Sequence, residues 1–161
     1  MKGTKNRFTK PTLYFSLVGF IAAAIPALFF IGVESCLEKL GYSCISAIPI
    51  ICNCAAFICL LLPISFFVYL LRSHSSFSDS QIKGRILIFD SILFLCIPTA
   101  LEPYVSTANT LCNVADGQNG LELVFSAWLA LPVLLLFSFI FEQIFKGRQI
   151  AILNSDGFIA V

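Results

Sequence analysis

Two carboxylates lie in the stretch 86–105, which is otherwise apolar: Asp90 near its start and Glu102 near its end. A carboxylate at the centre of a bilayer costs about 2.5–3.5 kcal/mol on insertion scales, so such acids are functional, paired or close to an edge. We expect both acids to lie near the edges, where they reach water or a partner. If they are functional, Asp90 and Glu102 are proton or cation sites. Asn53, in another apolar stretch, is a third candidate for such a site and for a hydrogen bond between helices.

Thiols are the second group of side chains with chemistry to offer. Of the seven cysteines, Cys36, Cys44 and Cys112 lie outside the apolar stretches, where an oxidising compartment favours disulfides. Any two of these three can pair, and the third then stays free or pairs with another chain. The other four behave as small apolar residues. The single histidine, His74, lies far from them, so the sequence predicts no metal site, no cofactor and no catalytic residue.

The elements that must position these side chains are transmembrane helices. The chain is 58% apolar and 12% charged, whereas soluble domains have about 45–50% and about 25%. About 20 apolar residues match the thickness of the hydrocarbon core, and inside lipid the backbone must bond within its own segment. The sequence therefore predicts an all-α, polytopic four-helix transmembrane bundle over residues 11–145, with spans at 11–33, 45–71, 86–105 and 121–141.

The distribution of positive charge predicts the orientation of the bundle. Nine of the ten Lys and Arg lie in the tail 1–10, in the connection 72–85 and in the tail 146–161, and Lys39 is the tenth. By the positive-inside rule both termini are cytoplasmic. The short loops and the absence of glycosylation sequons favour a bacterial inner membrane.

Small residues predict where the helices pack. Gly19, Ala23 and Ala27 repeat every four residues in the first span, and Ser126 and Ala130 do so in the fourth. Such faces let two membrane helices approach closely. In the C-terminal tail, two short apolar runs flank the turn-forming residues 154–157. This pattern is typical of a short hairpin, and a frayed tail is the alternative.

Four spans with cysteines in both outer loops resemble the layout of the quinone-linked disulfide oxidases of bacterial inner membranes. That family implies a Cys-x-x-Cys pair in the first outer loop and a second pair in the other. Here the first loop has Cys36 and Cys44 with seven residues between them, and the second has Cys112 alone. The resemblance is therefore one of layout.

Three functions fit these patterns. The first is a non-enzymatic accessory, regulatory or protective membrane protein that acts through helix–helix contacts in the bilayer, on another membrane protein or on a second copy. Immunity proteins against pore-forming bacteriocins have a similar build. The alternatives are a small transporter or channel that uses the intramembrane acids, and a thiol-redox enzyme that uses the outer-loop cysteines. Nucleic-acid binding is not expected, because the basic residues are few and follow the membrane edge.

Overall fold

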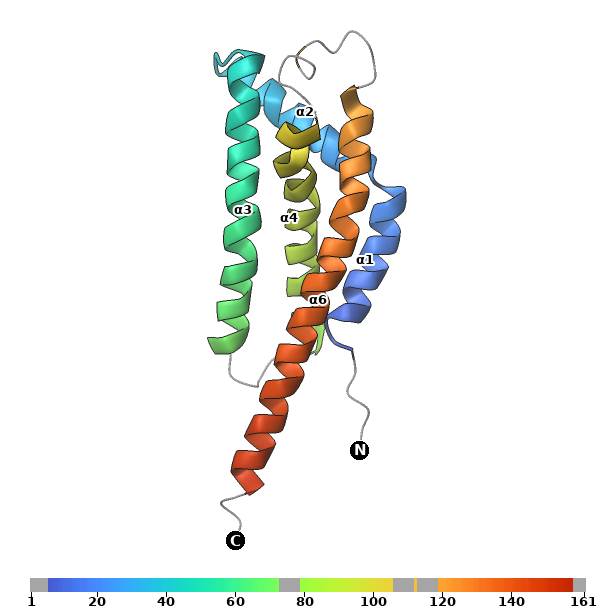
Figure 1. Cartoon of the computed structure of the whole chain (residues 1–161), viewed down its shortest axis with the longest axis vertical. Coiled ribbons are helices and arrows are strands. Elements are labelled where there is room, and N and C mark those ends of the chain that lie inside the picture. The colour runs from blue at the N-terminus through green and yellow to red at the C-terminus, as the bar shows by residue number, and fades with distance from the viewer. Residues whose placement is uncertain (1–5, 73–78, 106–111, 113–118, 158–161) are drawn as a thin grey trace.

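The computed structural model describes residues 6–72, 79–105, 112 and 119–157. In this part of the chain the long elements are five helices, which confirms the all-helical prediction (Figure 1). They are α1 (Thr9–Ile21), α2 (Ala24–Lys39), α3 (Cys44–Arg72), α4 (Asp79–Val105) and α6 (Asn119–Gly157). Of these, α3, α4 and α6 are each long and apolar enough to cross a membrane.

The first apolar stretch differs from the single helix that was expected. It forms α1 and α2, which meet at an angle of 73° and together pass the same length and composition test as one bent span. Pro26 explains the break, because a proline has no N–H for the carbonyl four residues earlier and its ring collides with that carbonyl. The carbonyl in question belongs to Ala22, which instead accepts a hydrogen bond from the backbone N–H of Ile25 at 3.0 Å.

The side chain of Trp128 on α6 repairs part of this break. The last carbonyls of a helix have no intrahelical donor, and in apolar surroundings each of them needs one. Trp128 donates from Nε1 to the carbonyl oxygen of Phe20 at 3.2 Å. The two rings also stack, with centroids 5.3 Å apart. The break is therefore held against α6.

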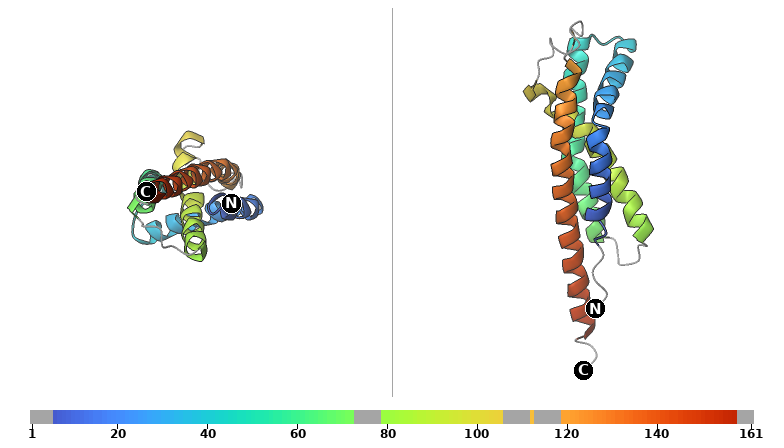
Figure 2. Two further views of the ribbon diagram at one scale, coloured as in Figure 1. Left: turned by 90° about the horizontal axis from the view of Figure 1, so that it is seen from below. Right: turned by 90° about the vertical axis from the view of Figure 1, so that its right-hand side faces the viewer.

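The C-terminal part of α6 extends past the ends of the other helices (Figure 2). The helix continues through Gly157. The short hairpin considered for the tail is therefore wrong over residues 149–157. Extending an existing helix adds one hydrogen bond per residue fixed, whereas a new hairpin must first be nucleated. Residues 158–161 lie outside the described part.

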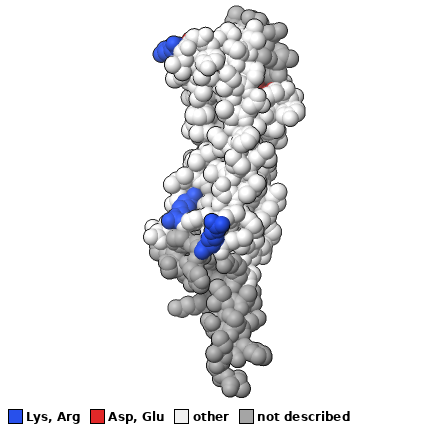
Figure 3. Space-filling view, turned by 90° about the vertical axis from the view of Figure 1, so that its left-hand side faces the viewer, with Lys and Arg blue, Asp and Glu red and all other residues white. Residues whose placement is uncertain are grey.

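The surface between the two ends of the molecule is apolar. On the face drawn in Figure 3, Lys and Arg lie near the top and, below mid-height, next to the residues drawn in grey; the surface between these two places is mostly uncharged. Large apolar side chains are widely exposed, among them Ile21 at 88%, Leu28 at 67% and Phe57 at 66%. A soluble protein rarely exposes so much contiguous apolar surface, which is typical of a membrane or protein interface.

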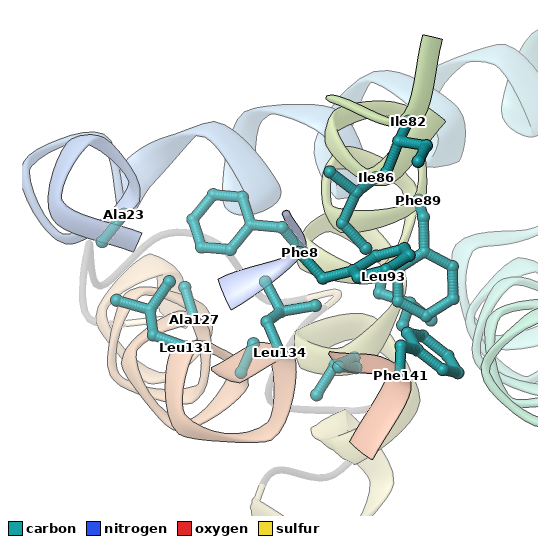
Figure 4. Packing of buried hydrophobic residues seen from close by; sticks show 13 residues of the cluster. Phe8, Ala23, Ile82, Ile86, Phe89, Leu93, Ala127, Leu131, Leu134 and Phe141 are labelled. Carbon is teal, nitrogen blue, oxygen red and sulfur yellow. The ribbon is translucent and has the colours of Figure 1, made fainter. Parts of the chain in front are cut away.

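The main core lies where α4 packs against α1 and α6, and α4 contacts all four other helices. Figure 4 shows Phe8, at the start of α1, among side chains of α4 and α6, with Phe89 and Phe141 packed beside each other. The centroids of these two rings are 5.4 Å apart. A second cluster joins α2 to α3 through Ala27, Phe30, Ile48, Ile51 and Cys52.

Gly19 lies at the tightest approach of α1 to its neighbours. A Cβ atom there would meet Leu131 Cδ2 at 3.1 Å and Phe94 Cε2 at 3.4 Å, whereas nothing lies within 4 Å of a Cβ at Gly32. We expect Gly19→Leu to lower the free energy of unfolding by about 1–3 kcal/mol through overpacking. Gly32→Leu, the control, gains the same helix propensity without the collision.

Thermal unfolding of both variants in mild detergent measures the difference. Equal stability of the two variants would contradict the packing of α1 described here.

Candidate functional site

Asp90 is buried inside the helix bundle. Its side chain is 0% exposed, and its Oδ2 accepts a hydrogen bond from Thr12 Oγ1 on α1 at 2.8 Å. Within the described residues Oδ1 has no hydrogen-bond partner, and the same holds for the buried Oγ of Ser16, one turn further along α1. The interface of α1 and α4 thus holds a small polar cluster that is only partly satisfied.

Glu102 is more isolated than Asp90. It is also 0% exposed, and neither of its carboxyl oxygens has a hydrogen-bond partner in the described part of the chain. The charged group that acts on it is another acid, Glu122 on α6. The expectation that both acids reach water or a partner is therefore wrong for Glu102. A buried carboxyl with no partner must carry its own proton or attract a cation, because leaving it charged and unpaired is far more costly.

The structure does not bring the three candidate ion sites together. Asp90 and Glu102 are twelve residues apart on α4, which is about 18 Å along a helix axis. Asn53 lies on α3 with its side chain exposed. A site in which two carboxylates share one proton is excluded for Asp90 and Glu102 at this separation.

A third buried acid, Glu142 on α6, was not among the predicted sites. Its Oε2 accepts a hydrogen bond from the backbone N–H of Phe8 at 2.8 Å, and its Oε1 lies 3.4 Å from Lys146 Nζ. A carboxylate at the start of a helix is favoured by the helix dipole. Glu142 therefore fixes the beginning of α1. Only the spacing of Glu142 and Lys146, four residues apart with the acid first, could have indicated a paired acid from sequence.

Cys44 and Cys112 form a disulfide, with their Cα atoms 5.8 Å apart. Cys36 remains free and exposed. Of the pairings left open by the sequence, this one ties the start of α3 to Cys112, between α4 and α6 in the sequence. It provides one disulfide rather than the two cysteine pairs that a disulfide-exchange enzyme of the layout described above would use.

The carboxylate of Glu34 lies beside this disulfide, with Oε1 2.7 Å from Cys44 Sγ. A disulfide sulfur has no hydrogen to donate, so this contact is a hydrogen bond only when the bridge is reduced. Ligand atoms of Glu34, Cys44 and Cys112 all lie within 4.8 Å of one another. A metal binds the thiolate form of cysteine. The cluster therefore offers three metal ligands only when Cys44 and Cys112 are reduced, with the carboxylate of Glu34 as the third ligand. In the oxidised form this cluster is a structural bridge.

All five residues of the predicted small-residue faces are buried. On the first apolar stretch, Gly19 packs against Leu131 and Phe94, and Ala23 and Ala27 are 3% and 6% exposed. On α6, Ser126 is 3% and Ala130 0% exposed. Because the break falls between Gly19 and Ala27, Gly19 belongs to α1, Ala27 to α2, and Ala23 lies at the break as the N-cap of α2. Ala23 enters the main core and Ala27 the second cluster.

Removing the hydroxyl of Thr12 tests whether Asp90 depends on it. Thr12→Val deletes the donor that Asp90 has within the described part, so we expect a loss of about 1–3 kcal/mol of stability. Thr99→Val is the matched control, because Thr99 is equally buried but donates to the carbonyl of Leu95 in its own helix.

Chemical denaturation in detergent compares the two threonine variants, alone and combined with Asp90→Asn. The cost of Thr12→Val should shrink in that background. Equal losses for both threonines, unchanged by Asp90→Asn, would show that the Thr12 hydrogen bond is unimportant.

Comparison of this chain with protein-family models, curated proteins and solved structures gave no match.

Proposed function

We propose that this protein is an accessory or protective membrane protein that acts by lateral contact of α3 with another transmembrane helix. In this proposal α3, α4 and α6 each cross a bacterial inner membrane, and the bent pair α1–α2 makes the fourth crossing. Both termini are cytoplasmic. The charge distribution supports this orientation, because nine of the ten Lys and Arg belong to the end that carries the two tails and the α3–α4 connection.

The unusual exposure of α3 supports a lateral role. Only 11% of its most apolar stretch is buried inside the protein, compared with 50% for α4 and 39% for α6. Its outward face is lined by large apolar side chains, among them Ile50, Phe57 and Leu61. Lipid alone can cover such a face, so apolar exposure does not by itself require a partner.

The observation that carries the proposal is the position of Asn53 on this outward face. Asn53 follows the start of α3 at Cys44 by nine residues, about 14 Å along the axis, and its side chain is exposed. An amide at that depth has no water to bind, and its favourable partner is a polar side chain of a second helix. One good interhelical hydrogen bond of this kind contributes about 0.6–2 kcal/mol.

Asn53→Leu should weaken lateral association by about 3- to 30-fold, as expected for the loss of one such hydrogen bond. Asn53→Gln, which keeps the amide, should largely restore it. A photocrosslinking phenylalanine analogue at Phe57, one turn along α3 and 66% exposed, detects the neighbour in native membranes. The same analogue at Phe139 on α6, which is 53% exposed, is the control.

The expected result is a discrete protein adduct from position 57 that depends on the amide at Asn53. An adduct of twice the chain mass identifies a second copy, and any other mass identifies a different partner. Adducts with lipid alone, or an adduct that Asn53→Leu leaves unchanged, would overturn the proposal.

Cys36 provides a test of the orientation, since it is free and exposed at the end opposite the N-terminal tail. A membrane-impermeant maleimide added to intact cells should label Cys36. After reduction it should also label Cys44 and Cys112, whose disulfide protects them. Cys36→Ser is the matched control. Labelling of Cys36 only after the cells are opened would reverse the orientation.

A second candidate function, a proton or cation pathway, is favoured by one specific observation. Glu102 is fully buried with both oxygens unpartnered in the described residues, and Glu122 lies near it. Intramembrane acids that face a bundle interior commonly mark ion pathways. Neither Asp90 nor Glu102 lines the cavities of about 530, 250 and 180 Å³ that described residues form.

Proteoliposomes loaded with a pH-sensitive dye test this second function. If it is correct, an applied potential drives proton entry with the unaltered protein, and Glu102→Gln abolishes the entry because its amide cannot release a proton. Glu38→Gln, at an exposed position of α2, should behave like the unaltered protein. Absence of proton entry with the unaltered protein would exclude the pathway.

A further inference from the structure

A groove lies between α1 and α4 at the end of the molecule where both helices begin. Its volume is about 530 Å³. Both helices contribute to its walls, although they are separated by more than 50 residues in the sequence. It is lined by Asn6, Arg7, Lys10, Pro11, Tyr14, Phe15, Val18, Lys83 and Leu87.

Three cations converge on this groove, and its lining contains no acid. Lys10 and Lys83 are exposed, and neither forms an ion pair within the described part of the chain. Arg7 is half-buried and its guanidinium lies 5.5 Å from the centre of the Phe145 ring, so its position is restrained. The nearest buried acid of α6, Glu142, is already engaged by Phe8 and Lys146. The groove is therefore suited to an anion.

An apolar cavity lies beside the groove, further along α1. This second cavity, of about 180 Å³, shares Phe15 and Val18 with the first and extends past Gly19 and Ala22 to Ile25. Its other wall is formed by residues of α4, among them Phe94 and Leu95. Gly19 and Ala22 contribute little side-chain volume to the lining of this second cavity. A groove with cationic side chains and an apolar cavity therefore lie next to each other along α1, and Phe15 and Val18 line both.

We propose that this groove binds an anionic phospholipid, with the phosphate held by Lys10 and Lys83 and one acyl chain lying along Val18 toward the second cavity. Basic pockets between transmembrane helices on the cytoplasmic side are suited to anionic headgroups. Tyr14, which is 60% exposed, belongs to the aromatic residues that favour the headgroup level.

A free phosphate or a nucleotide fits this shape less well. Such a ligand would use Lys10 and Lys83 but leave the apolar cavity empty. A neutral phospholipid would fill the apolar cavity but bring no net negative charge to Lys10 and Lys83. Only a ligand with an anionic head and an apolar chain uses both parts. This proposal requires that the helices lie in a bilayer, but it depends neither on a partner at α3 nor on a role for Glu102.

Native mass spectrometry of the detergent-purified full chain tests the proposal, with phosphatidylglycerol as the probe. Phosphatidylcholine with the same acyl chains is the neutral control, and glycerophosphoglycerol represents the free headgroup. We expect phosphatidylglycerol to bind tightly, phosphatidylcholine weakly and the free headgroup without competing. The combined variant Lys10→Gln and Lys83→Gln should lose about 30-fold in affinity for phosphatidylglycerol, equivalent to about 2 kcal/mol.

Two matched controls separate this site from general charge and surface effects. Arg72→Gln with Lys39→Gln removes the same charge outside the groove and should leave binding unchanged. Val18→Phe places a larger side chain where the two cavities adjoin and should weaken phosphatidylglycerol binding, whereas Leu17→Phe, at the adjacent exposed position that lines neither cavity, should not.

Equal affinity for the two lipids, or unchanged binding in the double lysine variant, would overturn the proposal. Full competition by glycerophosphoglycerol together with unaffected binding in Val18→Phe would also overturn it, in favour of a free phosphate ester as the ligand. None of these readouts depends on crosslinking at Phe57, so failure of the lipid site and failure of lateral docking are distinguishable.

Discussion

The break between α1 and α2 determines how the other helices are arranged. Pro26 denies the carbonyl of Ala22 its helical hydrogen bond, and Trp128 binds the nearby carbonyl of Phe20. Because the two segments then differ in direction by 73°, α1 packs on α4 and α6 while α2 reaches α3 as well. The hydrogen bond from Thr12 to Asp90 and the cationic groove lie on the α1 side of the break. The disulfide and its neighbouring carboxylate, Glu34 of α2, lie on the other side of the break.

The three buried acids differ in how well the protein satisfies them, and that difference separates structural roles from functional ones. Glu142 has a backbone donor and a lysine, so it stabilises the start of α1. Asp90 has one donor and one oxygen without a partner in the described residues. Glu102 has neither a donor nor a cation there. Packing alone would favour an apolar residue at the last position, so Glu102 is the acid that packing explains least.

Apolar length allowed the long helices to be predicted, but the contacts between them could not be. The stretch 45–71 became α3 almost residue for residue, because lipid-facing sequence and helix length are tied by the bilayer itself. The broken first span was not predicted. Pro63 and Pro132 lie inside unbroken helices, whereas Pro26 follows a break, and the difference depends on neighbours such as Trp128. The burial of Glu102 likewise depends on which helices surround α4, and no local pattern records that.

The lipid groove and the outward face of α3 lie on opposite sides of the bundle. Viewed along the bundle in Figure 2, α3 and α1 are separated by α4 and α6, and α4 packs extensively on both. A lipid between α1 and α4 would therefore leave the face around Asn53 free for another helix. Bound there, the lipid would brace α1, the shorter helix of the bent pair, against the helix that carries Asp90. Lipid composition could then influence how rigidly α4 is presented to α3 without any lipid touching the docking face.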